Sequence, residues 1–257
     1  MEMDPKISII TVCLNSQKTI EGTIQSVKSQ TYKNIEYIII DGLSSDQTLS
    51  IIDNYKEDVD ILQSEKDMGL YDALNKGIDC STGEVVCILH SDDVFQHDNV
   101  VMRVMEKFTT EKSDLCLSNM VIVNEKNRIV RYYPSHYFSK FLLLTGWMPG
   151  HPATFITREI YNRVGLYSLD YTIASDFDFF LRVFKEEDLK VSILREVTLR
   201  MKLGGKSNRD IQSKITISKE IKRALRSNGF LASYFLQIFR YIIRLVEIII
   251  RPSQLDK

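Results

Sequence analysis

The first 120 residues alternate between short apolar runs and longer stretches in which apolar residues recur at helical spacing. Between residues 18 and 30, for example, Ile20, Ile24 and Val27 share one face of a predicted helix. The apolar runs have the length of strands, and β-branched residues dominate the first two, which is typical of buried strands. The predicted strands are 7–13, 35–40, 60–63 and 85–89. Strands that alternate with helices in this way predict a parallel sheet with helices on both faces.

Polar residues stand at the carboxyl ends of three predicted strands. Asn15 follows the first strand, Asp41 ends the second, and the pair Asp92-Asp93 comes after the fourth. Ligands of open parallel sheets bind outside the carboxyl ends of the strands. We therefore expect these side chains to lie along one edge of the sheet and to border a binding site.

Beyond residue 120 the pattern is looser, with a predicted strand at 120–124, a helix near 136–144 and an amphipathic helix at 176–186. Residues 230–251 then form an apolar segment that polar residues interrupt at intervals of 4, 3, 4, 3 and 4. This spacing predicts a helix with one narrow polar stripe on an otherwise apolar surface. The stripe consists of Ser233, Gln237, Arg240, Arg244, Glu247 and Arg251.

Composition places the chain among globular proteins that fold without metal or disulfide crosslinks, because 44% of its 257 residues are hydrophobic and 26% are charged. None of the 4 cysteines forms a C-x-x-C pair, so buried thiols in a reducing cytoplasm are expected. The N-terminus lacks the pattern of a secretory signal. No apolar run approaches the roughly 18 residues of a membrane-spanning helix. We therefore expect a cytoplasmic protein.

The net charge of −1 conceals an asymmetry along the chain. Residues 1–120 carry 10 Lys and Arg against 21 Asp and Glu, whereas residues 121–257 carry 23 against 13. Basic residues precede the apolar segment at 230–251, which favours a helix lying on the anionic inner face of a membrane. Packing of that helix on the rest of the chain or in a homodimer is the alternative. Nucleic-acid binding is not expected, because the basic residues are not organised with stacking aromatics.

The chain lacks the common phosphate-binding loops, so a nucleotide would have to be bound in another way. No glycine-rich turn follows the first strand, and the chain has no Walker A, H-E-x-x-H or G-x-S-x-G sequence. The pair Asp92-Asp93 offers carboxylates for a hard divalent cation, and such a cation can bridge two phosphate oxygens. As a Lewis acid it would neutralise the charge of a departing diphosphate. A solvated turn is the alternative explanation for an isolated Asp-Asp pair.

Spaced segments of the chain resemble the family 2 glycosyltransferases of the GT-A fold, especially bacterial enzymes that build surface polysaccharides. They are 8–16 (SIITVCLNS), 39–46 (IIDGLSSD), 65–77 (EKDMGLYDALNKG), 82–84 (TGE), 89–94 (LHSDDV), 151–155 (HPATF), 165–167 (GLY) and 174–182 (ASDFDFFLR). The resemblance implies an α/β GT-A fold with a mostly parallel central sheet flanked by helices. It also implies a catalytic domain at 1–207, with a nucleotide-binding half (1–120) and an acceptor-binding half (121–207), before an amphipathic helical tail at 208–257.

The resemblance also implies which residues bind the nucleotide. Thr11, Cys13 and Asn15 would line the nucleoside site at the tip of the first strand. Asp41 would accept hydrogen bonds from the uracil or the ribose. Asp67 would lie where the loop after the third strand meets the base and the ribose.

The remaining roles that the resemblance implies concern the metal and the reaction. Asp93 would contact Mn²⁺ or Mg²⁺ and Asp92 the donor ribose or sugar, although Ser-Asp-Asp departs from the family's Asp-x-Asp. Asp176 matches the family's catalytic base, and the alternative is a carboxylate that stabilises a helix N-terminus. His151 would lie near the acceptor or the diphosphate, unless it makes an ordinary loop hydrogen bond. Lys206 would close over the diphosphate from a glycine-containing loop.

These features predict an inverting glycosyltransferase that moves a hexose from a UDP-sugar to a lipid-diphosphate-linked sugar at the inner face of a bacterial membrane. The products would be O-antigen, capsule or exopolysaccharide. The acceptor hydroxyl would attack C1 while Asp176 removes its proton. Two alternatives are a non-catalytic subunit that binds sugar nucleotides or assembles on membranes, and a nucleotidyltransferase. A nucleotidyltransferase would release pyrophosphate and would usually require a Gly/Arg/Lys-rich first loop, which this chain lacks.

Overall fold

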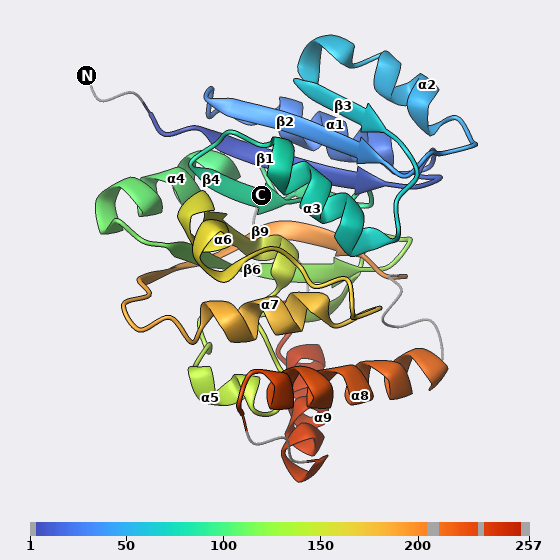
Figure 1. Ribbon diagram of the computed structural model, residues 1–257. Helices are drawn as coiled ribbons and strands as arrows, with labels where there is room; N and C mark the ends of the chain where they lie inside the picture. Colours follow the sequence, from blue (N-terminus) through green and yellow to red (C-terminus); the bar gives the residue numbers. More distant parts are fainter. Residues whose placement is uncertain (1–3, 205–210, 231–233, 253–257) are drawn as a thin grey trace.

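The computed structural model describes residues 4–204, 211–230 and 234–252 of the chain. Within these ranges, strands form one sheet in the order β3-β2-β1-β4-β8-β6-β9-β5, and β7 pairs with β6 (Figure 1). The strands are β1 Ile7–Cys13, β2 Ile35–Asp41, β3 Ile61–Ser64, β4 Val85–Ile88, β5 Asp93–Phe95, β6 Leu115–Val123, β7 Ile129–Tyr133, β8 Thr154–Thr157 and β9 Val191–Lys202. The helices are α1 Ile20–Lys28, α2 Thr48–Asp53, α3 Leu70–Cys80, α4 Val100–Glu111, α5 Lys140–Leu143, α6 Arg158–Val164, α7 Ser175–Val183, α8 Ile211–Ser227 and α9 Tyr234–Ile249, with 3₁₀ turns η1 Lys56–Asp58 and η2 His151–Ala153.

The first four strands along the sheet, β3, β2, β1 and β4, all run parallel. Their register pairs Cys13 with Asp41, so the tips of β1 and β2 end side by side at one edge, as predicted. Strand β8 connects the second half of the chain to this parallel part of the sheet, because it pairs antiparallel with both β4 and β6. Strands β6 and β9 run parallel to each other. The expected α/β fold, a central sheet flanked by helices, is confirmed.

Helices cover both faces of the sheet because buried residues of each strand alternate between two hydrophobic cores. Val86 and Ile88 of β4 belong to the core beneath α3, α6, α7 and α8. Val85 and Cys87 belong to the core beneath α1, α2 and α4. Figure 1 shows α3, α6 and α7 in front of the sheet. This double burial explains why the strands of the first half read as continuous apolar runs.

The C-terminal helices pack on the rest of the fold, which is the alternative that the sequence left open. Ile221, Ala224 and Leu225 of α8 are buried in the same core as α7, and α7 and α8 lie against each other (Figure 1). α9 packs on β7, where Glu247 forms a buried ion pair with Arg131. The expected division at 207/208 therefore does not separate two hydrophobic cores.

Within α9, the stripe residues from Gln237 to Glu247 lie on the side toward the protein, and most of the described apolar residues are exposed. Gln237 and Glu247 are 4% and 1% exposed, whereas Leu245 and Ile249 are 58% and 70% exposed. This orientation is the reverse of that of an ordinary surface helix, which buries its apolar side. None of the described helices is long and apolar enough to cross a membrane.

Candidate active site

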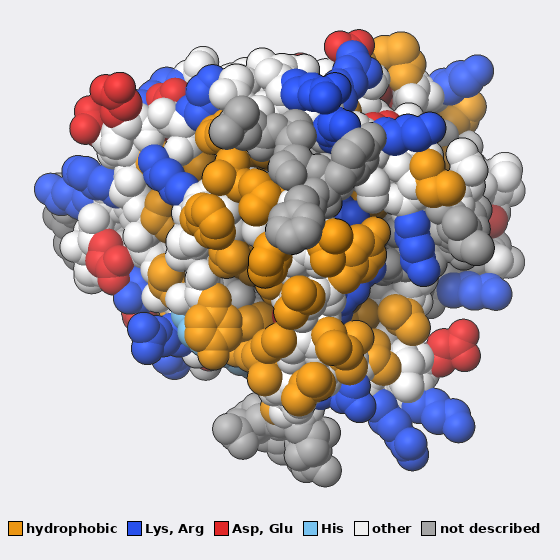
Figure 2. Space-filling view, turned by 90° about the horizontal axis from the view of Figure 1, so that it is seen from below, with side chains coloured by type: hydrophobic (Ala, Val, Ile, Leu, Met, Phe, Trp, Pro, Cys, Tyr) orange, Lys and Arg blue, Asp and Glu red, His pale blue; other side chains and the backbone are white. Residues whose placement is uncertain are grey.

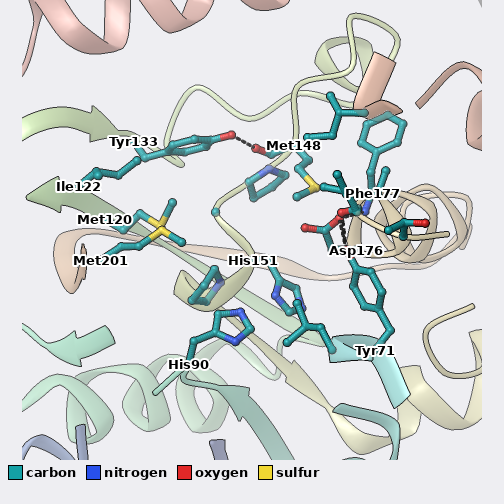
Figure 3. Close-up of a pocket in the computed structure, with 18 of the residues that line it drawn as sticks. Tyr71, His90, Met120, Ile122, Tyr133, Met148, His151, Asp176, Phe177 and Met201 are labelled. Carbon is teal, nitrogen blue, oxygen red and sulfur yellow. Dashed lines mark hydrogen bonds between the residues drawn. The ribbon is translucent and has the colours of Figure 1, made fainter. Parts of the chain in front are cut away.

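A cavity of about 670 Å³ lies at the carboxyl edge of the parallel strands. The loops after β1 and β4 contribute Leu14, Ser16, Ser91 and Asp92 to its lining. Further lining comes from the start of α7, from η2 and from helices α8 and α9. Figure 3 shows Tyr71, His151 and Asp176, which come from three different elements, grouped around this space. The position of the cavity agrees with the expectation from the strand ends.

Asp176 lies in the first turn of α7 and faces the cavity. Its Oδ1 atom accepts hydrogen bonds from the backbone N–H of Phe177 at 2.8 Å and from the Tyr71 hydroxyl at 3.3 Å (Figure 3). Burial raises the pKa of Asp176 to about 6, and these two hydrogen bonds oppose that rise. A carboxylate with a raised pKa is a stronger base than an ordinary one and is still ionised at neutral pH.

Two residues that the sequence analysis did not select hold the segment in front of Asp176. The Tyr71 hydroxyl has one proton, which it shares between the carbonyl of Ile173 and Oδ1 of Asp176, and it thereby links α3 to this segment. Glu220 of α8 accepts hydrogen bonds from three consecutive backbone N–H groups, at 2.9 Å each, which belong to Thr172, Ile173 and Ala174. The only hint in the sequence was an isolated glutamate within a basic stretch, and that pattern has no specific meaning.

The two carboxylates after β4 have opposite environments. Asp92 lines the cavity. Asp93 begins β5, is 0% exposed, and has two carboxylate oxygens without a hydrogen-bond partner among the described residues. Burial first, and then the charge of Asp92, raise the pKa of Asp93 well above its usual range. Asp92 therefore lines the cavity and Asp93 is buried beside it, and the expected division of the metal and donor contacts between them stays a prediction.

The expected nucleotide-binding residues at the tips of β1 and β2 fall into two groups: Cys13 lines the cavity, whereas Thr11 and Asp41 do not. Cys13 lines the cavity, and its thiol lies 3.5 Å from Oδ1 of Asp41. Asp41 is 0% exposed and is held by the backbone N–H of Ser44 at 2.9 Å and the hydroxyl of Ser64 at 2.7 Å. Thr11 is also 0% exposed, and its hydroxyl lies 3.1 Å from that of Tyr37. Asp41 and Thr11 therefore shape the strand ends but do not line the cavity.

Asn15 and Asp67 both lie at the surface of this region. Asn15 lines a smaller hollow that shares Ser16, Ser91 and Asp92 with the main cavity. Asp67 lines the main cavity and accepts a hydrogen bond from the backbone N–H of Gly69 at 2.9 Å.

Gly42 explains how the loop of Asp67 comes so close to the loop after β2. A Cβ atom at Gly42 would lie 2.5 Å from Oδ2 of Asp67, so a side chain there would displace the carboxylate.

His151 lines the cavity from η2, and its Nε2 atom lies 2.6 Å from the Tyr167 hydroxyl. Burial, followed by the neighbouring His90, lowers the pKa of His151 to about 3. The imidazole is therefore neutral at physiological pH and can donate or accept a hydrogen bond, but it adds no positive charge for a phosphate. Lys206, the other expected diphosphate ligand, lies outside the described residues.

The profile of the family described as "Glycosyl transferase family 2" matches residues 8–190. The chain belongs to this family. It is 33% identical over 185 residues to the uncharacterized glycosyltransferase Rv1514c of Mycobacterium tuberculosis (strain ATCC 25618 / H37Rv), covering 71% of this chain and 70% of the relative. It is 29% identical over 209 residues to the PGL/p-HBAD biosynthesis glycosyltransferase of Mycobacterium bovis (strain BCG / Pasteur 1173P2), covering 79% and 80% of the two chains.

A third relative is the UDP-Glc:alpha-D-GlcNAc-diphosphoundecaprenol beta-1,3-glucosyltransferase WfaP of Escherichia coli, which is 30% identical over 147 residues. That match covers 57% of this chain and 52% of WfaP.

Solved structures show the same fold at low sequence identity. TarS 1–349 of S. aureus in complex with UDP-GlcNAc matches with a TM-score of 0.68 at 18% identity, covering 88% of this chain and 68% of that one. The mannosyltransferase PcManGT of Pyrobaculum calidifontis in complex with GDP-Man and Mn²⁺ matches with a TM-score of 0.65 at 16% identity, covering 95% and 70%. The family 2 glycosyltransferase is thus a GT-A protein.

Proposed function

We propose that this family 2 glycosyltransferase transfers a hexose, with inversion, from a UDP-sugar to a sugar carried on a lipid diphosphate, in the synthesis of a bacterial surface polysaccharide. The observation that carries the proposal is that Asp92 and Asp176 line the same cavity. Asp92 lies at the strand edge, and Asp176 lies on a helix and has a raised pKa. The activity that the name of the relative WfaP states supports both the donor and the acceptor class.

Asp176 serves as the base in this proposal. With a pKa of about 6 it is mostly ionised at pH 7, and it binds the acceptor's proton more tightly than an ordinary aspartate would. The hydrogen bonds from Tyr71 and from the backbone of Phe177 fix the orientation of its carboxylate. A nucleotidyltransferase would not require such a base beside the sugar, so this geometry favours sugar transfer.

A divalent cation, Mn²⁺ or Mg²⁺, is part of the proposal, and Asp92 is the residue that would hold it. The described residues contain no group of three or more His, Cys, Asp or Glu side chains that could bind a metal by themselves. Such a site suits a cation that is bound through one or two carboxylates together with the phosphates of a substrate. When bound, the cation would supply Lewis-acid stabilisation of the departing diphosphate. Cys13, Asn15 and Asp67 would contact the nucleoside on the same side.

We place the protein at the cytoplasmic face of the membrane, bound there through the apolar side of α9. Figure 2 shows hydrophobic side chains gathered over one end of the molecule with Lys and Arg around them. On α9 the exposed apolar residues are Ile238, Phe239, Tyr241, Ile242, Leu245, Val246, Ile248 and Ile249. An apolar area of this kind on a soluble protein marks an interaction site, and its basic surroundings favour an anionic lipid surface. A second copy of the chain is the alternative occupant.

The experiment is a transfer assay with a panel of UDP- and GDP-sugars, Mn²⁺ or Mg²⁺, and a lipid-diphosphate-linked sugar acceptor. We expect release of UDP that depends on both the acceptor and the cation, and a product whose anomeric configuration is inverted. Release of pyrophosphate would instead identify a nucleotidyltransferase. A UDP-sugar that binds and raises the melting temperature, but is not consumed with any acceptor, would identify a non-catalytic subunit.

A further inference from the structure

The cavity that holds Asp176 also has a cationic region. Arg131 of β7, Lys214 of α8, and Arg240 and Arg244 of α9 all line it. Helices α8 and α9, which carry three of these residues, lie at the lower end of the fold in Figure 1, away from β1 and β2, whose tips carry the expected nucleotide residues. One cavity therefore has carboxylates from the strand edge and cations from the C-terminal helices.

Glu247 is an acidic residue that lies among these cations and acts on both Arg131 and Arg244. Glu247 accepts a hydrogen bond from Nε of Arg131 at 2.6 Å and from the indole N–H of Trp147 at 2.9 Å. Arg240 donates to the hydroxyl of Ser218 at 3.1 Å, which is an uncharged partner. Burial lowers the pKa of Arg244, the neighbouring Arg131 and Arg240 lower it further, and Tyr133 and Glu247 oppose this shift. Arg244 thus lies close enough to Arg131 and to Arg240 for repulsion between their positive charges, and an anion beside Arg244 would relieve that repulsion.

The chemistry of these cations suits a diphosphate. Guanidinium groups donate forked hydrogen bonds that match phosphate oxygens, and such charge-assisted bonds are stronger than neutral ones. Apolar residues also line the cavity beside the cations, including Trp147, Ile217 and Ile221. A ligand that joins a diphosphate to a hydrocarbon chain would satisfy both kinds of lining.

The orientation of α9 points to the same kind of ligand. Its inward stripe places Arg240 and Arg244 on the cavity, whereas its outward side exposes Leu245 and Ile249. A helix lying in a membrane interface has its apolar side at the level of the acyl chains and its polar side at the level of the headgroups. The diphosphate of a membrane-embedded prenyl lipid lies at that headgroup level, so the two sides of α9 would meet the two parts of one molecule.

We propose that Lys214, Arg240 and Arg244 form the site that binds the diphosphate of a prenyl-diphosphate-linked acceptor. The inference rests on the proposed function, because it specifies how the acceptor of that reaction is held. It assigns the cations of α8 and α9 to the acceptor and leaves the donor diphosphate to the Asp92 side of the cavity.

Trp147 allows a direct binding test, because it is the chain's 1 tryptophan, it lines the cavity, and it is hydrogen-bonded to Glu247. The full chain is titrated with farnesyl diphosphate, farnesol and inorganic pyrophosphate while the indole fluorescence is recorded. We expect farnesyl diphosphate to bind at least roughly tenfold more tightly than either fragment, since each fragment satisfies one part of the lining. Equal affinity for farnesol would show that the cations do not bind the diphosphate and would overturn the proposal.

Variants identify the residues that are responsible. Arg240→Gln should weaken farnesyl diphosphate binding by roughly tenfold or more and leave farnesol binding as it was, because only the charge-assisted bonds are lost. Lys214→Gln tests the same site at an exposed position of α8, where the fold is not at risk. The matched control is Arg251→Gln, which removes an equal charge just beyond α9, where Arg251 bonds to the carbonyls of Val130 and Ile248 outside the cavity.

Three further results would count against the site. An equal loss in Arg251→Gln would mean that only the general positive charge attracts the ligand. Displacement of farnesyl diphosphate by UDP, together with weaker UDP binding in Arg240→Gln, would assign the cations to the donor. Transfer to lipid-diphosphate acceptors with no defect in either cavity variant would also contradict the inference. If farnesyl diphosphate binds as expected but the transfer assay fails with every acceptor, the proposed function is wrong and the prenyl-diphosphate site stands.

Discussion

The cavity brings together two regions of the chain that are built in different ways. On the strand side, residues at the ends of neighbouring strands hold one another, as when Asp41 is bound by Ser44 and Ser64, which are 3 and 23 positions away. On the side of the C-terminal helices, single carboxylates make contacts over long sequence distances: Glu220 binds the segment before α7, and Glu247 binds Arg131 and Trp147. The opposite charges of the two halves of the chain therefore meet across one cavity.

Asp176→Asn removes the proposed base, which lies between the two regions. Transfer should fall by roughly 10²- to 10⁴-fold while donor binding is retained, because general base catalysis is lost but the nucleotide contacts are not. The rate of the unaltered enzyme should rise with pH through about 6, the pKa of Asp176, since only the ionised form accepts a proton. Steady-state kinetics against pH check both points, with Asp188→Asn as an exposed control. Retention of most activity in Asp176→Asn would remove this residue from the mechanism.

The pair Asp92→Asn and Asp93→Asn tests the strand side. Asp92→Asn should reduce turnover by roughly a hundredfold and weaken cation-dependent UDP binding, because it removes the cavity-facing carboxylate. Asp93→Asn should keep most activity, because its carboxyl is buried and its raised pKa favours the neutral form, which an amide resembles. Calorimetric titration of UDP with and without Mn²⁺ is the measurement. If the two variants exchange these behaviours, Asp93 contacts the cation after all.

Leu245→Glu tests the outward side of α9. Binding to vesicles with anionic lipids should weaken by roughly tenfold, because a charge replaces an apolar residue that would enter the acyl region. Leu62→Glu is the matched control, since Leu62 is also exposed but lies on β3 at the far edge of the sheet. Sedimentation with vesicles measures the binding, and light scattering records the oligomeric state. Loss of a dimer in Leu245→Glu without any vesicle binding by the unaltered chain would show that a second copy covers this face.

Glu220→Gln tests the long-range support of Asp176. Turnover should fall by roughly three- to tenfold, because a neutral amide accepts weaker hydrogen bonds from the three N–H groups. The acidic limb of the rate profile should move to lower pH by less than about one unit, since the charge of Glu220 helps to raise the pKa of Asp176. Glu187→Gln, at an exposed position after α7, is the control. A loss of activity without any movement of the acidic limb would limit Glu220 to structural support.

The raised pKa of Asp176 also predicts a small effect on stability. Its folded-state pKa of about 6 exceeds the usual 3.8, so the ionised carboxylate destabilises the fold at pH 7. Asp176→Asn should therefore raise the free energy of unfolding at pH 7 by about 1 to 3 kcal/mol. The difference should shrink as the pH falls from 6 towards 4 and vanish below about 4, where the carboxyl is protonated in both states. Urea unfolding at pH 7 and pH 3 measures it, and equal differences at both values would contradict the assigned pKa.

Much of the strand side could be predicted from the sequence because the relevant forces are local. The runs at 7–13 and 35–40 are apolar on both faces, which is typical of a strand buried between two layers of helices, and β1 and β2 end within one residue of the predicted limits. Parallel strands align their carboxyl ends, so the edge with Asn15, Asp41 and Asp92 followed from the order of the elements alone.

Other elements and roles could not be predicted because they depend on neighbours that are distant in sequence. Strand β9 was missed, since its burial is irregular and comes from pairing with both β6 and β5. Asp92 and Asp93 are adjacent and chemically identical, and only the pairing of β5 with β9 buries one and leaves the other in the cavity.

The sequence by itself determined the fold class, the edge of the sheet at which the cavity lies, and the existence of a helix with one polar stripe. Periodicity specifies which residues share a face of a helix, but it does not specify which way that face points. Only the tertiary structure decided that the stripe of α9 turns inward, because Glu247 is paired with Arg131 and Trp147 at the place where α9 meets β7. The same packing brings the cations of the C-terminal helices into the cavity of Asp176, through contacts between residues about a hundred positions apart.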